Sequence, residues 1–86
     1  MRIYLQIPTV ENKPPRFYQL ILQKDLYEGW TLVREWGNQG TSGRTKRDHF
    51  PTRALAEAAM LRVRDTQVDR GYKVVFMQGQ EQLPHE

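Results

Sequence analysis

Apolar and polar residues alternate in three short segments, and a fourth, more polar segment follows them before the chain reaches its single helical segment. Alternation with a period of two is typical of strands that bury one face. Since another short apolar segment follows the helix, the sequence predicts an α+β fold: a small antiparallel sheet of four to five strands with one amphipathic helix packed on it. The expected strands are Arg2–Ile7, Arg16–Lys24, Trp30–Trp36, Arg44–Phe50 and Tyr72–Phe76.

The second and third strands are expected to form a hairpin, because only five residues, Asp25–Gly29, separate them. Gly29 is placed to supply the backbone conformation that such a turn often requires. Arg44–Phe50 is polar on both faces, which favours the edge of the sheet. A bend or bulge near Gly37 would place Trp36 at the rim of the sheet rather than in its core.

The helix is predicted to begin after Thr52, a residue type that caps helix N-termini, and to end at Gly71. Arg62 and Asp65 lie on the side expected to face the sheet, where they form an ion pair or mark the rim of the contact. The apolar residues of that side are Ala54, Leu55, Ala58, Leu61 and Val68.

A chain of 86 residues is long enough for one small core and too short for two. We expect residues 1–76 to form a single domain and residues 77–86 to be a flexible C-terminal tail, because the tail has no apolar pattern. No apolar run is long enough to span a bilayer, and the N-terminus does not resemble a secretory signal. The expected location is therefore the cytoplasm.

The excess positive charge of the chain lies in one segment. The net charge is +3, and residues 34–53 contain five basic and two acidic residues, so this segment accounts for the whole excess. Such placement favours an anion-binding face. The alternative is an ordinary solvated strand face, and charge alone does not choose between the two.

A glycine-rich segment follows the third strand. Trp36 is followed directly by Gly37, and Gly40 and Gly43 recur at a spacing of three. These glycines either present backbone N–H groups to a phosphate or only shape a turn. Trp36 is correspondingly a stacking platform for a base or sugar, or an ordinary aromatic residue of the core or the rim. Trp30 is expected in the core.

The sequence predicts no enzyme, no cofactor and no metal site. Its only histidines, His49 and His85, have no carboxylate at a metal-ligand spacing, and the chain contains no cysteine. No nucleophile lies beside a base and an orienting group. The glycine spacing lacks the lysine and hydroxyl pattern of a P-loop, so nucleotide hydrolysis is not expected.

Several spaced motifs together resemble the WGR domain family across residues 3–75. They are Phe17-Tyr18, the runs 29–37 and 40–46, Phe50–Thr52 and Gly71-Tyr72. The resemblance implies nucleic-acid binding, as in the DNA-dependent poly(ADP-ribose) polymerases, and the family also includes short stand-alone bacterial proteins. In the polymerases the motif tryptophan packs against a sugar or base at a DNA end, and the motif arginine supports that contact.

The three motif positions carried onto this chain are Trp36, Gly37 and Asn38. Asparagine thus stands where the motif has arginine. Since asparagine has neither a charge nor a guanidinium plane, the polar contact of the motif has to come from elsewhere, such as Arg34 or Arg44.

We therefore predict a small nucleic-acid-binding module for DNA ends or strand breaks, with little sequence specificity. The alternative is a protein–protein interaction adaptor that uses the same Trp-Gly loop and edge strand. The chain is expected to be a monomer or a homodimer. The predicted nucleic-acid-binding residues are Trp36, Gly37, Asn38, Arg34, Gly40, Gly43, Arg44, Lys46, Arg47 and Arg53.

Overall fold

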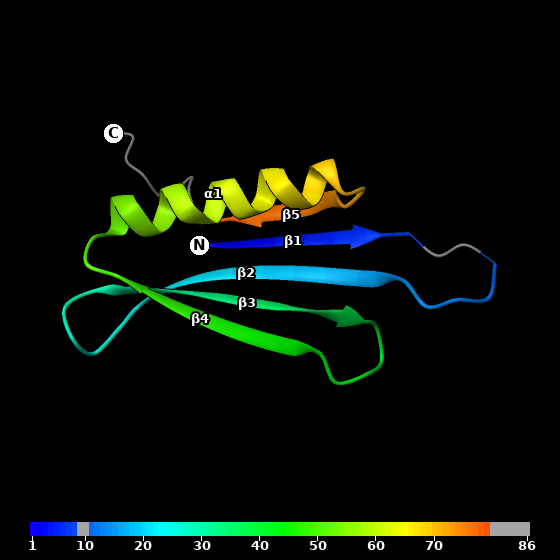
Figure 1. The fold of residues 1–86 in the computed structure, drawn as a ribbon, viewed down its shortest axis with the longest axis horizontal. Helices are drawn as coiled ribbons and strands as arrows, with labels where there is room; N and C mark the ends of the chain where they lie inside the picture. The colour runs from blue at the N-terminus through cyan, green and yellow to red at the C-terminus, as the bar shows by residue number, and fades with distance from the viewer. Residues whose placement is uncertain (9–10, 80–86) are drawn as a thin grey trace.

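One helix packs on one face of a five-stranded sheet in the computed structural model, which describes residues 1–8 and 11–79 (Figure 1). The α+β architecture expected from the sequence is therefore confirmed. The elements are β1 (Arg2–Ile7), β2 (Arg16–Lys24), β3 (Trp30–Asn38), β4 (Arg44–Phe50), α1 (Arg53–Asp69) and β5 (Lys73–Gln78).

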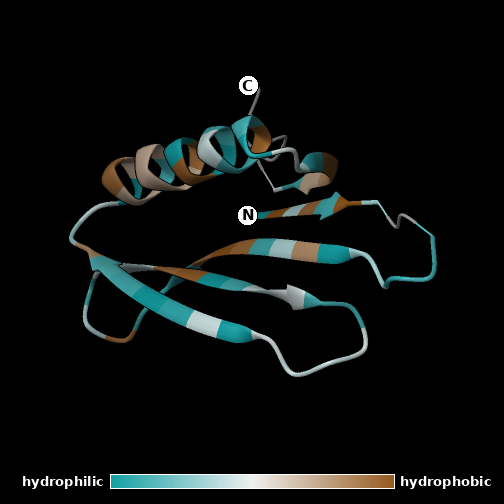
Figure 2. Ribbon diagram, turned by 45° about the vertical axis from the view of Figure 1, so that its right-hand side comes forward, coloured by the Kyte–Doolittle hydropathy of each residue, from teal (hydrophilic) through white to brown (hydrophobic). Residues whose placement is uncertain are grey.

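The strands follow the order β4-β3-β2-β1-β5, and every neighbouring pair is antiparallel. Strands β2 and β3 form the expected hairpin, and β4 lies at the expected edge. Figure 2 shows β4 as almost wholly hydrophilic, and exposed charge on an edge strand opposes pairing with other chains. Strand β5 closes the other edge and pairs with β1 through a register shift between Tyr4 and Leu5.

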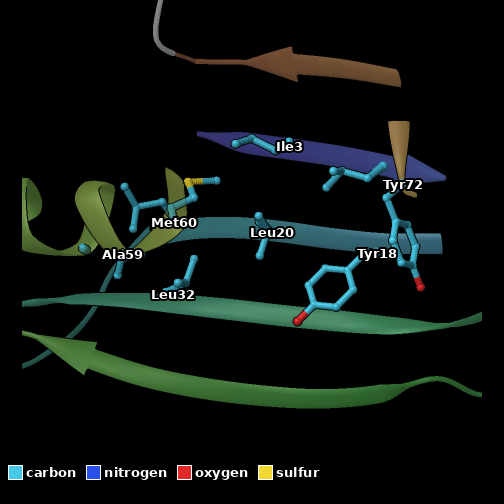
Figure 3. Close-up of a cluster of buried hydrophobic side chains, with 10 residues drawn as sticks. Ile3, Tyr18, Leu20, Leu32, Ala59, Met60 and Tyr72 are labelled. Atoms are coloured by element: carbon cyan, nitrogen blue, oxygen red, sulfur yellow. The ribbon is translucent and has the colours of Figure 1, made fainter. Parts of the chain in front are cut away.

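The core lies between α1 and the sheet (Figure 3). Alternate residues of β1 and β2 point toward the helix, which follows from the two-residue period of a strand. Tyr18 and Tyr72 lie together at one end of this cluster (Figure 3). The largest fully buried side chains are Ile3, Leu5, Leu20, Leu32 and Met60.

Both ends of α1 are capped as the sequence predicts. The Thr52 hydroxyl accepts a hydrogen bond from the Leu55 backbone N–H at 3.2 Å. At the other end Gly71 has φ 107°, and its N–H donates to the Val68 carbonyl. The Tyr72 N–H donates to the Gln67 carbonyl, which completes a Schellman motif and satisfies carbonyls that the last turn leaves unpaired.

The predicted helix face is wrong except for Leu61, which packs against the core. Leu55 and Val68 are 52% and 44% exposed, whereas the buried residues of α1 are Ala56, Ala59, Met60 and Gln67. Apolar residues occur at positions all around this helix, so its hydrophobicity does not single out one side. The sheet selects the side that carries Met60, whose flexible side chain fills the space above β2. The proposed Arg62–Asp65 pair is also absent, because Asp65 pairs with Arg64 at 3.0 Å.

The turn between β2 and β3 is organised by Asp25. One carboxylate oxygen accepts from the backbone N–H groups of Tyr27 and Gly29, and the other lies 2.6 Å from His49 Nδ1 on β4. Desolvation of Asp25 opposes its ionisation, but the two backbone bonds and His49 outweigh it, so the pKa of Asp25 is lowered.

Gly29 has a different role from the expected one. The left-handed conformation in this turn belongs to Glu28, with φ 61°. Gly29 is instead a point of close approach, because a Cβ there would stand 2.3 Å from His49 Cε1 and 2.8 Å from the Phe50 carbonyl oxygen.

Strand β5 extends to Gln78, two residues into the segment expected to be a tail, and Met77 packs against the core. Residues 80–86 of that expected tail lie outside the described residues. Within residues 1–8 and 11–79, no helix is both long and apolar enough to cross a membrane.

Candidate nucleic-acid interface

Trp36 begins a row of three aromatic side chains on the helix-facing side of the sheet. Its ring stacks on Tyr18 of β2, with centroids 5.4 Å apart and planes 10° apart. Tyr18 meets Tyr72 edge to face at 5.8 Å. The strand register continues through Gly37 without a shift, so the expected bulge at that position is wrong. Trp36 is half-buried, and the regular pairing keeps it on this side.

Basic side chains extend the same surface across β3 and β4. Arg34 lies opposite Lys46, and Trp36 lies opposite Arg44, so these residues share one face. An Arg34 terminal nitrogen donates to Asp48 at 3.1 Å, which orients the guanidinium. The Arg34 Nε atom is buried and has no hydrogen-bond partner. A buried N–H without a partner is costly, so an acceptor bound to this atom would stabilise the site.

A groove of about 800 Å³ separates this surface from the second half of α1. Its walls carry five cationic side chains and one carboxylate, that of Asp48. The groove also contains the aromatic row described above. The cationic residues are Arg16, Arg34, Lys46, Arg62 and Arg70.

Three of those cations were missed by sequence reasoning. Arg16 was assigned only to a strand, and Arg62 only to an ion pair or a rim. Arg70 precedes the helix-ending Gly71 and carried no pattern of its own. The one available signal was the repeat of arginine at Arg62 and Arg70, which are eight residues apart and therefore lie on similar sides of a helix.

The glycines between β3 and β4 shape a tight turn. Gly40 has φ 86°, and the backbone N–H and hydroxyl of Thr41 both donate to the Asn38 carbonyl. A Cβ at Gly43 would stand 2.6 Å from the Trp36 carbonyl oxygen, and one at Gly37 would stand 3.0 Å from Gly43 Cα. Gly37 and Gly43 thus allow the two strands to meet closely beside Trp36, whereas Gly40 supplies the positive φ of the turn.

The remaining predicted site residues are dispersed. Arg44 and Asn38 are exposed next to the glycine turn. Arg47 pairs with Val33, which places it on the opposite face of the sheet from Lys46. Arg53 lies over the Trp30 ring, 5.3 Å from its centroid, at the other end of β3. Trp30 is half-buried against the core, close to its expected place.

In the described part of the chain, no group of three or more histidine, aspartate or glutamate side chains is arranged to hold a metal ion. The cationic and aromatic side chains of the groove are suited to binding a polyanion.

Comparison with protein families matches the WGR domain over residues 1–80. A search of curated proteins finds no match.

Proposed function

Because this chain belongs to the WGR domain family, whose members are nucleic-acid-binding modules rather than catalytic domains, we propose that it binds DNA at free ends or strand breaks. The bound end enters the groove between α1 and strands β2–β4. Trp36 stacks on a terminal base or sugar, and the surrounding cations contact phosphates.

The main observation that supports this proposal is that cationic side chains and an aromatic row line the same groove. Five cations converge with only Asp48 to offset them, and Trp36 lies among them on a tyrosine that fixes its ring. Stacking on an aromatic ring contributes about 1–3 kcal/mol per base and requires no particular sequence. Phosphate contacts likewise carry no sequence information, so low specificity follows.

Asn38 does not replace the motif arginine. Its carbonyl is used by Thr41 in the turn, and its side chain is exposed and uncharged. The charge required beside Trp36 is instead available from Arg34 and Lys46 on the sheet and from Arg70 on the far wall. In this chain the phosphate contacts are therefore assigned to the groove rather than to the third motif position.

The test is fluorescence anisotropy with a short duplex that has a 5′-phosphorylated free end, beside a closed dumbbell of the same sequence, at several salt concentrations. We expect salt-sensitive binding that favours the free end. Trp36→Ala should weaken binding to the free end about tenfold while changing dumbbell binding little.

Tyr27→Ala is the matched control, because Tyr27 is 84% exposed in the β2–β3 turn and does not line the groove. Equal losses on both substrates for Trp36→Ala would contradict end stacking. Absence of binding to either substrate at low salt would overturn DNA binding altogether.

The second candidate is a protein–protein interaction adaptor that uses the Trp36-Gly37 turn and the β4 edge. Asn38 in place of arginine favours it, because it removes the charge that suits DNA. A partner protein that co-purifies in stoichiometric amount would support this function, whereas nuclease-sensitive absorbance at 260 nm would support the first.

A further inference from the structure

A second row of aromatic side chains lies on the face of the sheet that α1 does not cover. Phe17 of β2, Tyr4 of β1 and Phe76 of β5 stand on three neighbouring strands. Tyr4 lies 6.3 Å from Phe17 and 5.8 Å from Phe76 between ring centroids, with planes 10° and 16° apart. We call these three residues the open-face row.

The open-face row is not part of the core. Its three rings are half-buried, whereas the fully buried side chains point to the other side of the sheet. Tyr18 and Phe17 are consecutive in β2, so the two aromatic rows of the molecule stand back to back. Half-exposed aromatic rings on adjacent strands form an apolar surface, and bases of single strands are commonly held by stacking on such rings.

Charge around the open-face row suits a phosphate backbone. The Arg2 guanidinium lies 5.0 Å from the Phe76 ring centroid. Lys73 pairs with Gln6 on the same face, so a cation stands on each side of Phe76 along β5. The remaining polar side chains of this face on β1, β2 and β5 are amides, and one of them, Gln19, donates to the Glu35 carboxylate of β3 at 3.1 Å. Amides can donate to and accept from base edges.

The open-face row also adjoins the turn beside Trp36. The Gln39 side chain leaves that turn and donates to the Tyr4 hydroxyl at 2.6 Å. A Cβ at Gly43 would stand 3.2 Å from Phe17 Cζ, so the turn lies directly against this ring. The same turn therefore contacts the groove through Trp36 on one side and the open-face row on the other.

We propose that the open-face row is a second binding site, which takes a segment of single-stranded nucleic acid with its bases stacked on Phe17, Tyr4 and Phe76 and its phosphates near Arg2 and Lys73. The basic flanks favour this ligand over a neutral sugar, which would also stack on aromatic rings. The site is separate from the groove, and its occupation does not require the groove to bind a DNA end.

The first experiment maps backbone amide chemical shifts of the whole chain during titration with a twelve-nucleotide oligothymidylate at low salt. We expect the largest changes at the open-face row and at Arg2, with smaller changes at Trp36. Changes confined to the groove, or no changes on the open face at saturating oligonucleotide, would overturn the proposal. This measurement needs no variant, so it does not depend on how a substitution affects folding.

The second experiment measures oligothymidylate affinity for Phe76→Leu, which keeps an apolar side chain but removes the flat ring. We expect a loss of about tenfold. Tyr27→Leu removes an exposed aromatic residue elsewhere and should leave affinity unchanged.

Trp36→Leu separates this proposal from DNA-end binding. It should weaken binding to a duplex end and spare oligothymidylate binding, whereas Phe76→Leu should do the reverse. If Phe76→Leu folds and keeps full affinity for oligothymidylate, or if only Trp36→Leu weakens it, the open-face site is refuted while end binding in the groove stands.

Discussion

Single residues decide how closely the strands of this protein can approach one another. Gly43 and Gly29 both occupy points where a methyl group would collide with backbone or ring atoms of a neighbouring strand. Gly40 instead adopts a left-handed conformation with open space around it. Glycines of the same short chain thus serve two physical purposes, close approach and positive φ.

Gly43→Ala is expected to destabilise the fold by about 1–3 kcal/mol, because the new Cβ would have to displace the Trp36 carbonyl. Urea denaturation monitored by circular dichroism measures this loss. Gly40→Ala is the matched comparison: its Cβ meets nothing, and only the positive φ costs about 1 kcal/mol. A Gly43→Ala variant as stable as the wild type would show that the turn can open without cost.

Asp25 makes stability depend on pH. Its pKa is lower in the folded protein than the ordinary value of 3.8, so the ionised carboxylate stabilises the fold above that value. This contribution is lost as the pH falls through the lower, folded-state pKa. The urea midpoint of the wild type should therefore decrease between about pH 4 and pH 2.

Asp25→Asn keeps an oxygen that can accept from Tyr27 and Gly29 but cannot ionise. We expect this variant to be less stable at neutral pH and to lose less stability on acidification than the wild type. Parallel acid slopes for the two proteins would exclude Asp25 as the source of the pH dependence.

Among the elements, α1 shows how a helix with apolar residues on all sides acquires a buried face. The two ends of α1 are set by the local capping residues Thr52 and Gly71, and both ends were predicted. The rotation of α1 about its axis depends on which side chains fit the surface formed by β1–β3. The predicted buried face of the helix was therefore wrong. Met60 is completely buried, while Leu55 is 52% exposed.

Met60→Ala should cost about 2–5 kcal/mol, because it leaves a cavity among fully buried side chains. Leu55→Ala removes a similar number of carbon atoms from the exposed side and should change stability by less than about 0.5 kcal/mol. Both values come from urea denaturation. A larger loss for Leu55→Ala than for Met60→Ala would reverse the assignment of the buried face.

At the scale of the whole molecule, the groove exists only because helix and sheet are brought together. Its cations come from β2, β3, β4, α1 and the residue that caps α1. The single cation that each element contributes would by itself be an ordinary surface charge. Their convergence raises the local potential, which attracts a polyanion before any specific contact forms.

The double variant Arg62→Gln/Arg70→Gln should bind the duplex end more weakly and with a shallower dependence on salt. Each phosphate contact that is lost lowers the slope of log affinity against log salt by about 0.9 for duplex DNA. Anisotropy titrations between low and moderate salt measure both quantities.

Arg64→Gln is the control, since Arg64 pairs with Asp65 and does not line the groove. The same loss of slope in Arg64→Gln as in the double variant would indicate general attraction to a basic protein rather than contact within the groove.

The strands, the caps of α1, the hairpin and the family could be predicted from the residues, because they depend on local period, on capping side chains and on motifs along the chain. The buried side of α1 could not be predicted in this way. Nor could the groove, in which Arg16, Arg62 and Arg70 join Arg34 and Lys46. A buried helix face and a groove depend on how side chains from distant segments pack against one another. This packing produces no periodic pattern in the sequence of any single segment.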